Sequence, residues 1–115
     1  MKKTVAIRGA VNIYSNTKAE IEEASLRLMD EILNNNNLKY EDIISVQISS
    51  TADITAYYPA TALRLGGCTA PLFSCLEPPI ENAMPLCIRF LILAGFNNKT
   101  KPLNIYLNDT IKLIS

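Results

Sequence analysis

Two arginines lie within segments that the sequence otherwise predicts to be apolar strands. Arg8 interrupts the β-branched and apolar segment 4–10, and Arg89 interrupts the apolar segment 84–96. A guanidinium stays charged even when it is buried, so each side chain must reach an anion or the solvent-exposed face of its strand. A half-exposed strand would explain either arginine alone. Both together favour a shared anion pocket, and the fork of an arginine suits a carboxylate.

Other polar residues could complete such a pocket. Glu77 follows an apolar segment and is either a loop carboxylate or a group that faces the arginines and orients a substrate hydroxyl. Tyr106 is either a packed aromatic or a hydroxyl directed into the pocket, and segment 57–59 is either a pocket wall or a surface turn. The pattern predicts a positively charged pocket with few proton-transfer groups. Such a site suits a reaction that needs only positioning and electrostatic stabilisation.

The composition excludes several other kinds of chemistry. The 115 residues include no histidine, which removes imidazole base catalysis, Ser-His-Asp hydrolysis and histidine metal ligation. Eleven basic residues balance eleven acidic ones, so no positive surplus favours nucleic-acid binding. The three cysteines, Cys68, Cys75 and Cys87, form no CxxC pair and predict neither a zinc site nor a disulfide framework. We expect no metal, no cofactor and no nucleic-acid partner.

Length and hydropathy predict one domain without a membrane partner. A chain of this size buries roughly 65% of its unfolded surface, which is enough for one core. No apolar stretch approaches the roughly 20 residues of a membrane span, and Arg8 interrupts the N-terminal segment too early for a signal peptide. Unpaired cysteines suit a reducing compartment. We therefore expect a single cytoplasmic domain over residues 1–115.

The elements that must position these residues can be predicted from periodicity. Strands are expected at 4–10, 43–50, 71–76 and 84–96, with a terminal hairpin of 103–107 and 110–114. One long helix is expected after Thr17, which has capping-box spacing from Glu20, and it should end within asparagines 34–37, with Arg27 facing solvent. A short helix is expected at 59–65. The predicted class is α+β, a mixed β-sheet packed against one long helix.

Five blocks of the sequence resemble the AroH-type monofunctional chorismate mutases, and the blocks cover nearly the whole chain. They are Ile7-Arg8-Gly9-Ala10, Tyr58-Pro59-Ala60 with Ala62 and Arg64, Pro71-Leu72 leading to Glu77, Cys87-Ile88-Arg89, and Ile105-Tyr106-Leu107. The resemblance implies a pseudo α/β-barrel homotrimer with active sites at the subunit interfaces. It also implies the unimolecular conversion of chorismate to prephenate, on the route to phenylalanine and tyrosine.

The resemblance further implies a role for each matching residue. Arg89 would donate to the breaking ether oxygen and to a carboxylate, while Arg8 and Tyr106 would hold the enolpyruvyl carboxylate. Glu77 would accept a hydrogen bond from the ring hydroxyl. The remaining substrate contacts would be Tyr58, Ala60, Leu72 and Leu113 in the apolar walls, Arg64 near the entrance, and Phe73, Ser74 and Thr61.

The last three of these positions depart from the family pattern. Ser74 replaces a cysteine, and this change should be tolerated because serine can still donate a hydrogen bond. Phe73 replaces a small polar residue. Thr61 replaces a lysine near the second carboxylate, so weaker substrate binding is expected there. Two alternatives stay open at this point. One is a non-catalytic trimeric binder of small carboxylates on the same fold. The other is a trimeric deaminase-like protein of similar pseudo-barrel shape, which fits the arginine, glutamate and tyrosine set less well.

Overall fold

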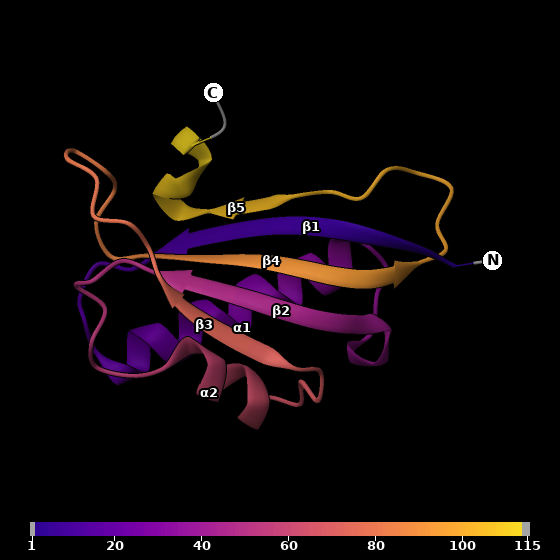
Figure 1. Cartoon of the computed structure of the whole chain (residues 1–115), viewed down its shortest axis with the longest axis horizontal. Helices are drawn as coiled ribbons and strands as arrows, with labels where there is room; N and C mark the ends of the chain where they lie inside the picture. The colour runs from indigo at the N-terminus through magenta and orange to yellow at the C-terminus, as the bar shows by residue number, and fades with distance from the viewer. Residues whose placement is uncertain (1, 114–115) are drawn as a thin grey trace.

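The computed structural model describes residues 2–113 as a five-stranded sheet with its two α-helices on one face (Figure 1). The elements are β1 (Lys3–Asn12), α1 (Lys18–Asn35), the 3₁₀ helix η1 (Tyr40–Asp42), β2 (Ile43–Ser50), α2 (Pro59–Leu65), β3 (Leu72–Leu76), β4 (Cys87–Phe96), β5 (Ile105–Leu107) and the 3₁₀ helix η2 (Asn108–Leu113). The strand order is β3-β2-β4-β1-β5. Because β4 is antiparallel to both neighbours while β5 and β3 are parallel to theirs, the sheet is mixed, as predicted.

Helix α1 begins and ends where the sequence predicts. The Thr17 hydroxyl accepts from the backbone N–H of Glu20 at 3.2 Å, which satisfies one of the unpaired donors of the first turn. The Glu20 carboxylate accepts instead from the backbone N–H of Tyr14, so the capping box is not reciprocal. The helix stops at Asn35, and Asn37 takes a left-handed conformation with φ of 52°. Its buried positions recur at helical spacing: Ile21, Ala24, Ser25, Leu28, Met29, Ile32 and Leu33.

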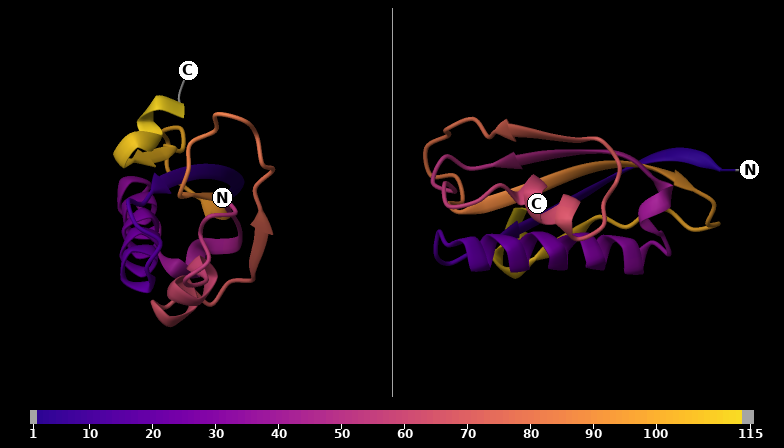
Figure 2. Two further views of the ribbon diagram at one scale, coloured as in Figure 1. Left: turned by 90° about the vertical axis from the view of Figure 1, so that its left-hand side faces the viewer. Right: turned by 90° about the horizontal axis from the view of Figure 1, so that it is seen from below.

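The two faces of the sheet differ in what covers them. The inner face packs against α1, and the approach is so close that a Cβ on Gly9 would lie 2.7 Å from Ile32 Cδ1. On the opposite, outer face, seen bare of helices over the central strands in Figure 2, register places one row of side chains across all five strands. That row is Cys75, Ser49, Arg89, Ala10 and Tyr106.

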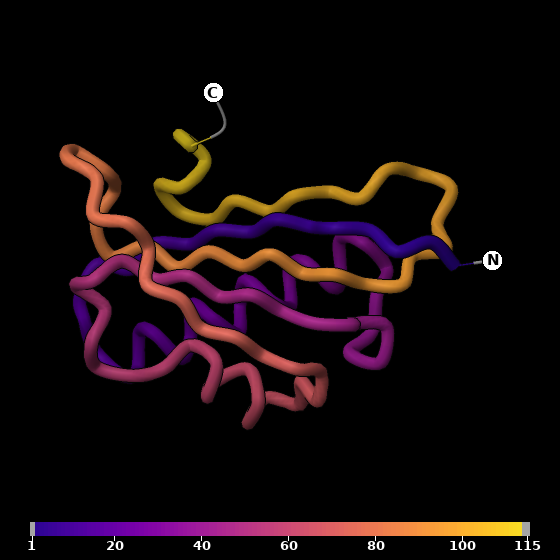
Figure 3. Tube along the Cα trace, in the orientation of Figure 1, coloured from indigo at the N-terminus to yellow at the C-terminus, as the bar shows by residue number. Residues whose placement is uncertain are grey.

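The predicted terminal hairpin is wrong. Ile105–Leu107 forms β5 alone, parallel to β1 and beside it in Figure 3, and the chain then turns into η2 at Asn108, where φ is 56°. Thr110, expected in the second strand, lies fully buried in η2 with its hydroxyl 3.0 Å from the carbonyl oxygen of Ala10. Residue 114 of the predicted strand lies outside the described residues.

The strand that carries Arg89 starts later than predicted. It begins at Cys87 rather than residue 84, because Pro85 lacks a backbone N–H and Leu86 adopts a left-handed φ of 50°. Within residues 2–113, none of the helices is both long and apolar enough to span a membrane.

Candidate active site

The centre of the site is an ion pair between two residues that the sequence singled out. Arg89 lies on the outer face of β4, and Glu77 directly follows β3, where its backbone N–H donates to the carbonyl oxygen of Ser50 at 2.9 Å. Arg89 Nε lies 2.6 Å from Glu77 Oε1. The two groups meet across β2, where the small side chain of Ser49 lies between their strands. The arginine side chain is 40% exposed and the glutamate 14%, so one end of the guanidinium is held while the rest stays accessible.

Arg8 and Tyr106 lie on the same face as this ion pair. Ala10 is opposite Arg89 on one side and Tyr106 on the other, so only a methyl group separates these two strands' side chains. Arg8 precedes Ala10 by two residues and therefore points to the same side of β1. It is exposed, and within residues 2–113 it makes no salt bridge. The face thus presents one unpaired cation and one partly neutralised cation, an arrangement that suits an anionic ligand.

Strand alternation divides the predicted residues of β3 between the two faces. Phe73 is opposite Gln47 and points outward with 63% of its surface exposed. Ser74 is opposite Ile48 and points inward, so it lies on the other side of β3 from the Glu77–Arg89 pair. Cys75, which the sequence analysis did not assign to the site, is the β3 side chain in the row of Arg89.

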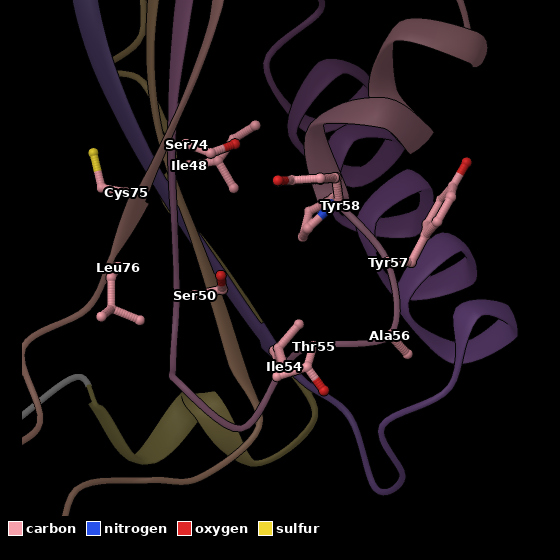
Figure 4. Close-up of a pocket in the computed structure, with 11 residues that line it drawn as sticks. Ile48, Ser50, Ile54, Thr55, Ala56, Tyr57, Tyr58, Ser74, Cys75 and Leu76 are labelled. Carbon is pink, nitrogen blue, oxygen red and sulfur yellow. The ribbon is translucent and has the colours of Figure 1, made fainter.

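Ser74 instead faces a cavity of about 600 Å³ between the sheet and the segment leading into α2 (Figure 4). Tyr58 points into this cavity toward Ser74 and Ile48, whereas Tyr57 and Cys75 point away from it. The Tyr58 side chain is largely exposed. The cavity therefore combines an aromatic hydroxyl, a serine hydroxyl and aliphatic walls, and none of the described residues that line it is charged.

The remaining predicted residues line two other cavities. Ala60, Thr61, Arg64 and Leu72 surround a volume of about 560 Å³ beside α2. Leu113 borders another of about 550 Å³ at the end of β1. The described part of one chain therefore does not bring the twelve predicted residues into a single pocket. It gathers Arg8, Phe73, Glu77, Arg89 and Tyr106 on the outer face and distributes the others.

Two of the thiols are poor nucleophiles in this setting. Burial raises the pKa of the Cys87 thiol, and the neighbouring Arg89 opposes this effect only in part. Burial also raises the pKa of Cys68. Among the described residues, no three acidic or thiol side chains come together in a way that could hold a metal ion. The chemistry that the outer face offers is fixed positive charge with one carboxylate beside it.

The sequence analysis missed a polar network next to this face. Asn12, at the end of β1, is buried and bonded to the start of η2 through Asp109. A polar residue at the end of an otherwise apolar strand was the available signal. Arg27 was expected to face solvent, and its side chain is 40% exposed. Its terminal amino group also donates to Asn108 Oδ1 at 3.0 Å, so it helps to hold η2.

Comparisons with known proteins find similar proteins over most of the chain. Residues 4–114 match the family model described as chorismate mutase type I. A chorismate mutase AroH from Thermus thermophilus is 32% identical over 112 residues, covering 93% of this chain and 90% of the relative. The chorismate mutase AroH of Bacillus subtilis is 32% identical over 88 residues, covering 75% and 69%. A solved chorismate mutase from Clostridium thermocellum superposes with a TM-score of 0.87 at 32% identity, over 94% of this chain and 98% of that one.

Proposed function

This chain belongs to the chorismate mutase type I family, and we propose that its outer sheet face carries the charged half of the site that converts chorismate to prephenate. One observation carries the proposal. Arg8, Arg89, Glu77 and Tyr106 lie on a single uncovered face, although they come from four separate parts of the chain. The enzyme is an isomerase of aromatic amino-acid biosynthesis.

The rearrangement is unimolecular, so the protein must hold a compact conformer and stabilise charge rather than supply a nucleophile. As the carbon–oxygen bond of chorismate breaks, negative charge grows on the ether oxygen. A cation fixed beside that oxygen stabilises the transition state more than the ground state. Arg89 fits this role because its Nε is held by Glu77 and its side chain remains partly accessible for donation to the substrate.

The neighbouring groups would orient the dianionic substrate. Arg8 makes no salt bridge among the described residues, so with Tyr106 it can hold the enolpyruvyl carboxylate. Glu77 can accept a hydrogen bond from the ring hydroxyl while it stays paired with Arg89. Fixing both ends of the substrate selects the reactive chair-like conformer, which is the entropic part of the catalysis.

We propose that the site is completed in a homotrimer. Four apolar side chains are exposed on the outer face: Phe73, Ile44, Leu91 and Leu93. Association with other copies of the chain would cover them. The predicted wall residues lie in cavities away from this face, so a neighbouring copy that presents its cavity there would bring Tyr58 and Ser74 toward Arg89. Three sites at three interfaces would result.

The substitutions in this chain would affect binding more than turnover. Thr61 and Arg64 line one cavity, and Arg64 is the one charged residue in its described lining. The second carboxylate of chorismate would therefore meet less positive charge there than a lysine at position 61 would give. We expect a raised KM for chorismate. A cytoplasmic location belongs to the same proposal, because Cys68, Cys75 and Cys87 are free thiols that suit a reducing compartment.

The direct test is an ultraviolet assay of chorismate loss with the purified protein, with prephenate identified as the product. Loss of chorismate at enzymic rates supports the proposal. Binding of chorismate without turnover would instead show a carboxylate-binding protein on the same fold. A wild-type kcat/KM in folded Arg8→Ala and Arg89→Ala variants would place the reaction elsewhere on the molecule.

A further inference from the structure

Asn12 makes three hydrogen bonds that join the end of β1 to η2. Its carbonyl oxygen accepts from Asn108 Nδ2 at 2.8 Å, and its Oδ1 accepts from the backbone N–H of Asp109 at 2.8 Å. Its Nδ2 donates to Asp109 Oδ2 at 3.1 Å. The residue is only 4% exposed, and a buried amide whose oxygen and nitrogen both have hydrogen-bond partners is costly to disturb.

These bonds act on the segment that immediately follows Tyr106. Strand β5 has three residues, lies at the edge of the sheet and pairs with β1 alone. So short a strand has few ladder bonds of its own to fix its position. The chain leaves β5 at Leu107 and enters η2 through Asn108, whose left-handed φ of 56° is held by the bond to Asn12.

Strand β1 contacts both β5 and η2. Asn12 lies two residues beyond Ala10 on the outer side of β1, and Ala10 is the residue opposite Tyr106. Thr110 reinforces the arrangement, because its hydroxyl lies 3.0 Å from the carbonyl oxygen of Ala10 and 2.6 Å from that of Leu107. β1 therefore sets the position of β5 from one side and that of η2 from the other.

We propose that Asn12 is a positioning residue for the mutase reaction: by fixing η2 to β1 through Asp109, it holds the Tyr106 hydroxyl in place on the face of Arg8 and Arg89. The inference rests on the proposed function, because it takes Tyr106 as a contact to the substrate carboxylate. That contact is made in the ground state and the transition state alike. Its loss should raise KM and leave kcat nearly unchanged.

The decisive variants exchange the members of the Asn12–Asp109 pair. Asn12→Asp places a second carboxylate beside that of Asp109, and the two repel each other. The Asp109 carboxylate also accepts a hydrogen bond from the Tyr14 hydroxyl at 3.1 Å. The exchanged double variant, Asn12→Asp with Asp109→Asn, restores one amide and one carboxylate in reversed positions. We expect KM for chorismate to rise about tenfold in Asn12→Asp, roughly the contribution of one hydrogen bond to a carboxylate, and to return close to wild type in the exchanged variant.

Two controls are needed. One tests whether a loss of stability alone changes KM, and the other tests whether Asn12 acts through the Tyr106 hydroxyl. Leu38→Ala removes a core side chain near the start of β2, at the end of the sheet away from η2, and should lower the melting temperature without changing KM. Tyr106→Phe should raise KM by itself. Asn12→Asp added to Tyr106→Phe should raise it no further, because Asn12 acts through the hydroxyl that is already missing.

Each result decides the inference. A wild-type KM in folded Asn12→Asp, or additive effects in the double variant with Tyr106→Phe, overturns it while the proposed function stands. A wild-type KM in Tyr106→Phe overturns both the substrate contact and the inference. If Asn12→Asp does not fold, Asp109→Ala takes its place, since it removes the acceptor of Asn12 Nδ2 from a more exposed position, and an increase in KM of at least about threefold is then required.

Discussion

Replacing Arg89 by alanine should depress turnover by about two to three orders of magnitude. The substitution removes a preorganised donor from the outer face, and the loss of one such donor typically costs about 10²–10³ in kcat. It also leaves Glu77, whose side chain is only 14% exposed, without its cation. A carboxylate about 5 Å from a dianionic substrate opposes binding by roughly 3 kcal/mol at an effective dielectric constant of 20. Arg89→Ala should therefore lower kcat and raise KM at once.

A second substitution separates these two effects. Glu77→Gln removes the uncompensated charge, and the glutamine oxygen can still accept from a ring hydroxyl. In Arg89→Ala/Glu77→Gln we expect KM to recover most of its increase, while kcat stays about 10²–10³ below wild type. Arg89→Lys keeps the charge and loses the fork, so it should recover only part of the rate.

The measurement is steady-state chorismate loss over a range of substrate concentrations, alongside circular dichroism of each variant. Arg89→Ala/Glu77→Gln removes both charges, so it should change stability by no more than about 1 kcal/mol. Arg89→Ala alone leaves the largely buried Glu77 carboxylate without its cation, so it should be the less stable of the two. Lys101→Ala, which removes one positive charge from an exposed loop position, is the matched control for long-range electrostatics. A folded Arg89→Ala protein with wild-type kcat would refute the assignment of the site.

Four further outcomes are expected. Leu93→Glu, on the exposed outer face, should convert the proposed trimer into an inactive monomer in sedimentation experiments, and a fully active monomer would contradict the proposed assembly. A thiol reagent should modify exposed Cys75 quickly and Cys68 and Cys87 slowly, because burial raises the pKa of both buried thiols; Cys75→Ala should stay active after the same treatment. Turnover should be unchanged by EDTA, since neither charge stabilisation nor conformer selection needs a metal. Hydrogen bonds from the backbone N–H of Lys39 and from the Lys2 ammonium lower the pKa of the Asp42 carboxyl. The ionised Asp42 therefore adds to the free energy of unfolding above the ordinary carboxyl range, and this contribution is lost as pH falls below roughly 4. Urea titrations of Asp42→Asn over this pH range should lack that part of the pH dependence.

The elements that the sequence predicts correctly are those specified by neighbouring residues. Helix α1 has its cap at Thr17, its apolar stripe and its terminating asparagines within one segment, so no tertiary information is needed. The terminal hairpin failed for the opposite reason. Thr110 has a strand-forming side chain, but its hydroxyl bonds to Ala10, a hundred residues earlier, and this contact selects a 3₁₀ helix over a second strand.

The same distinction between local and long-range information applies to the candidate site. Arg8 and Arg89 were recognisable because a charge inside an apolar strand conflicts with its surroundings. Their common face and the ion pair with Glu77 depend on β2 lying between β3 and β4, and no local pattern contains that order. Asn12 escaped notice because its partner, Asp109, is 97 residues away in sequence.

The resemblance to the family implies that Ser74 contacts substrate, and its place on the inner face of β3 is compatible with that role. Alternation along β3 puts Phe73 and Cys75 on the face of Arg89 and sends Ser74 to the cavity of Tyr58, so within one chain the serine cannot take part in the site beside Glu77. In the proposed trimer the two faces of β3 serve different sites: the outer face belongs to the chain's own arginines, and the inner cavity serves a neighbour. In that arrangement the position matched to the family's cysteine would act across an interface, and a second copy of the chain would be required to enclose the substrate.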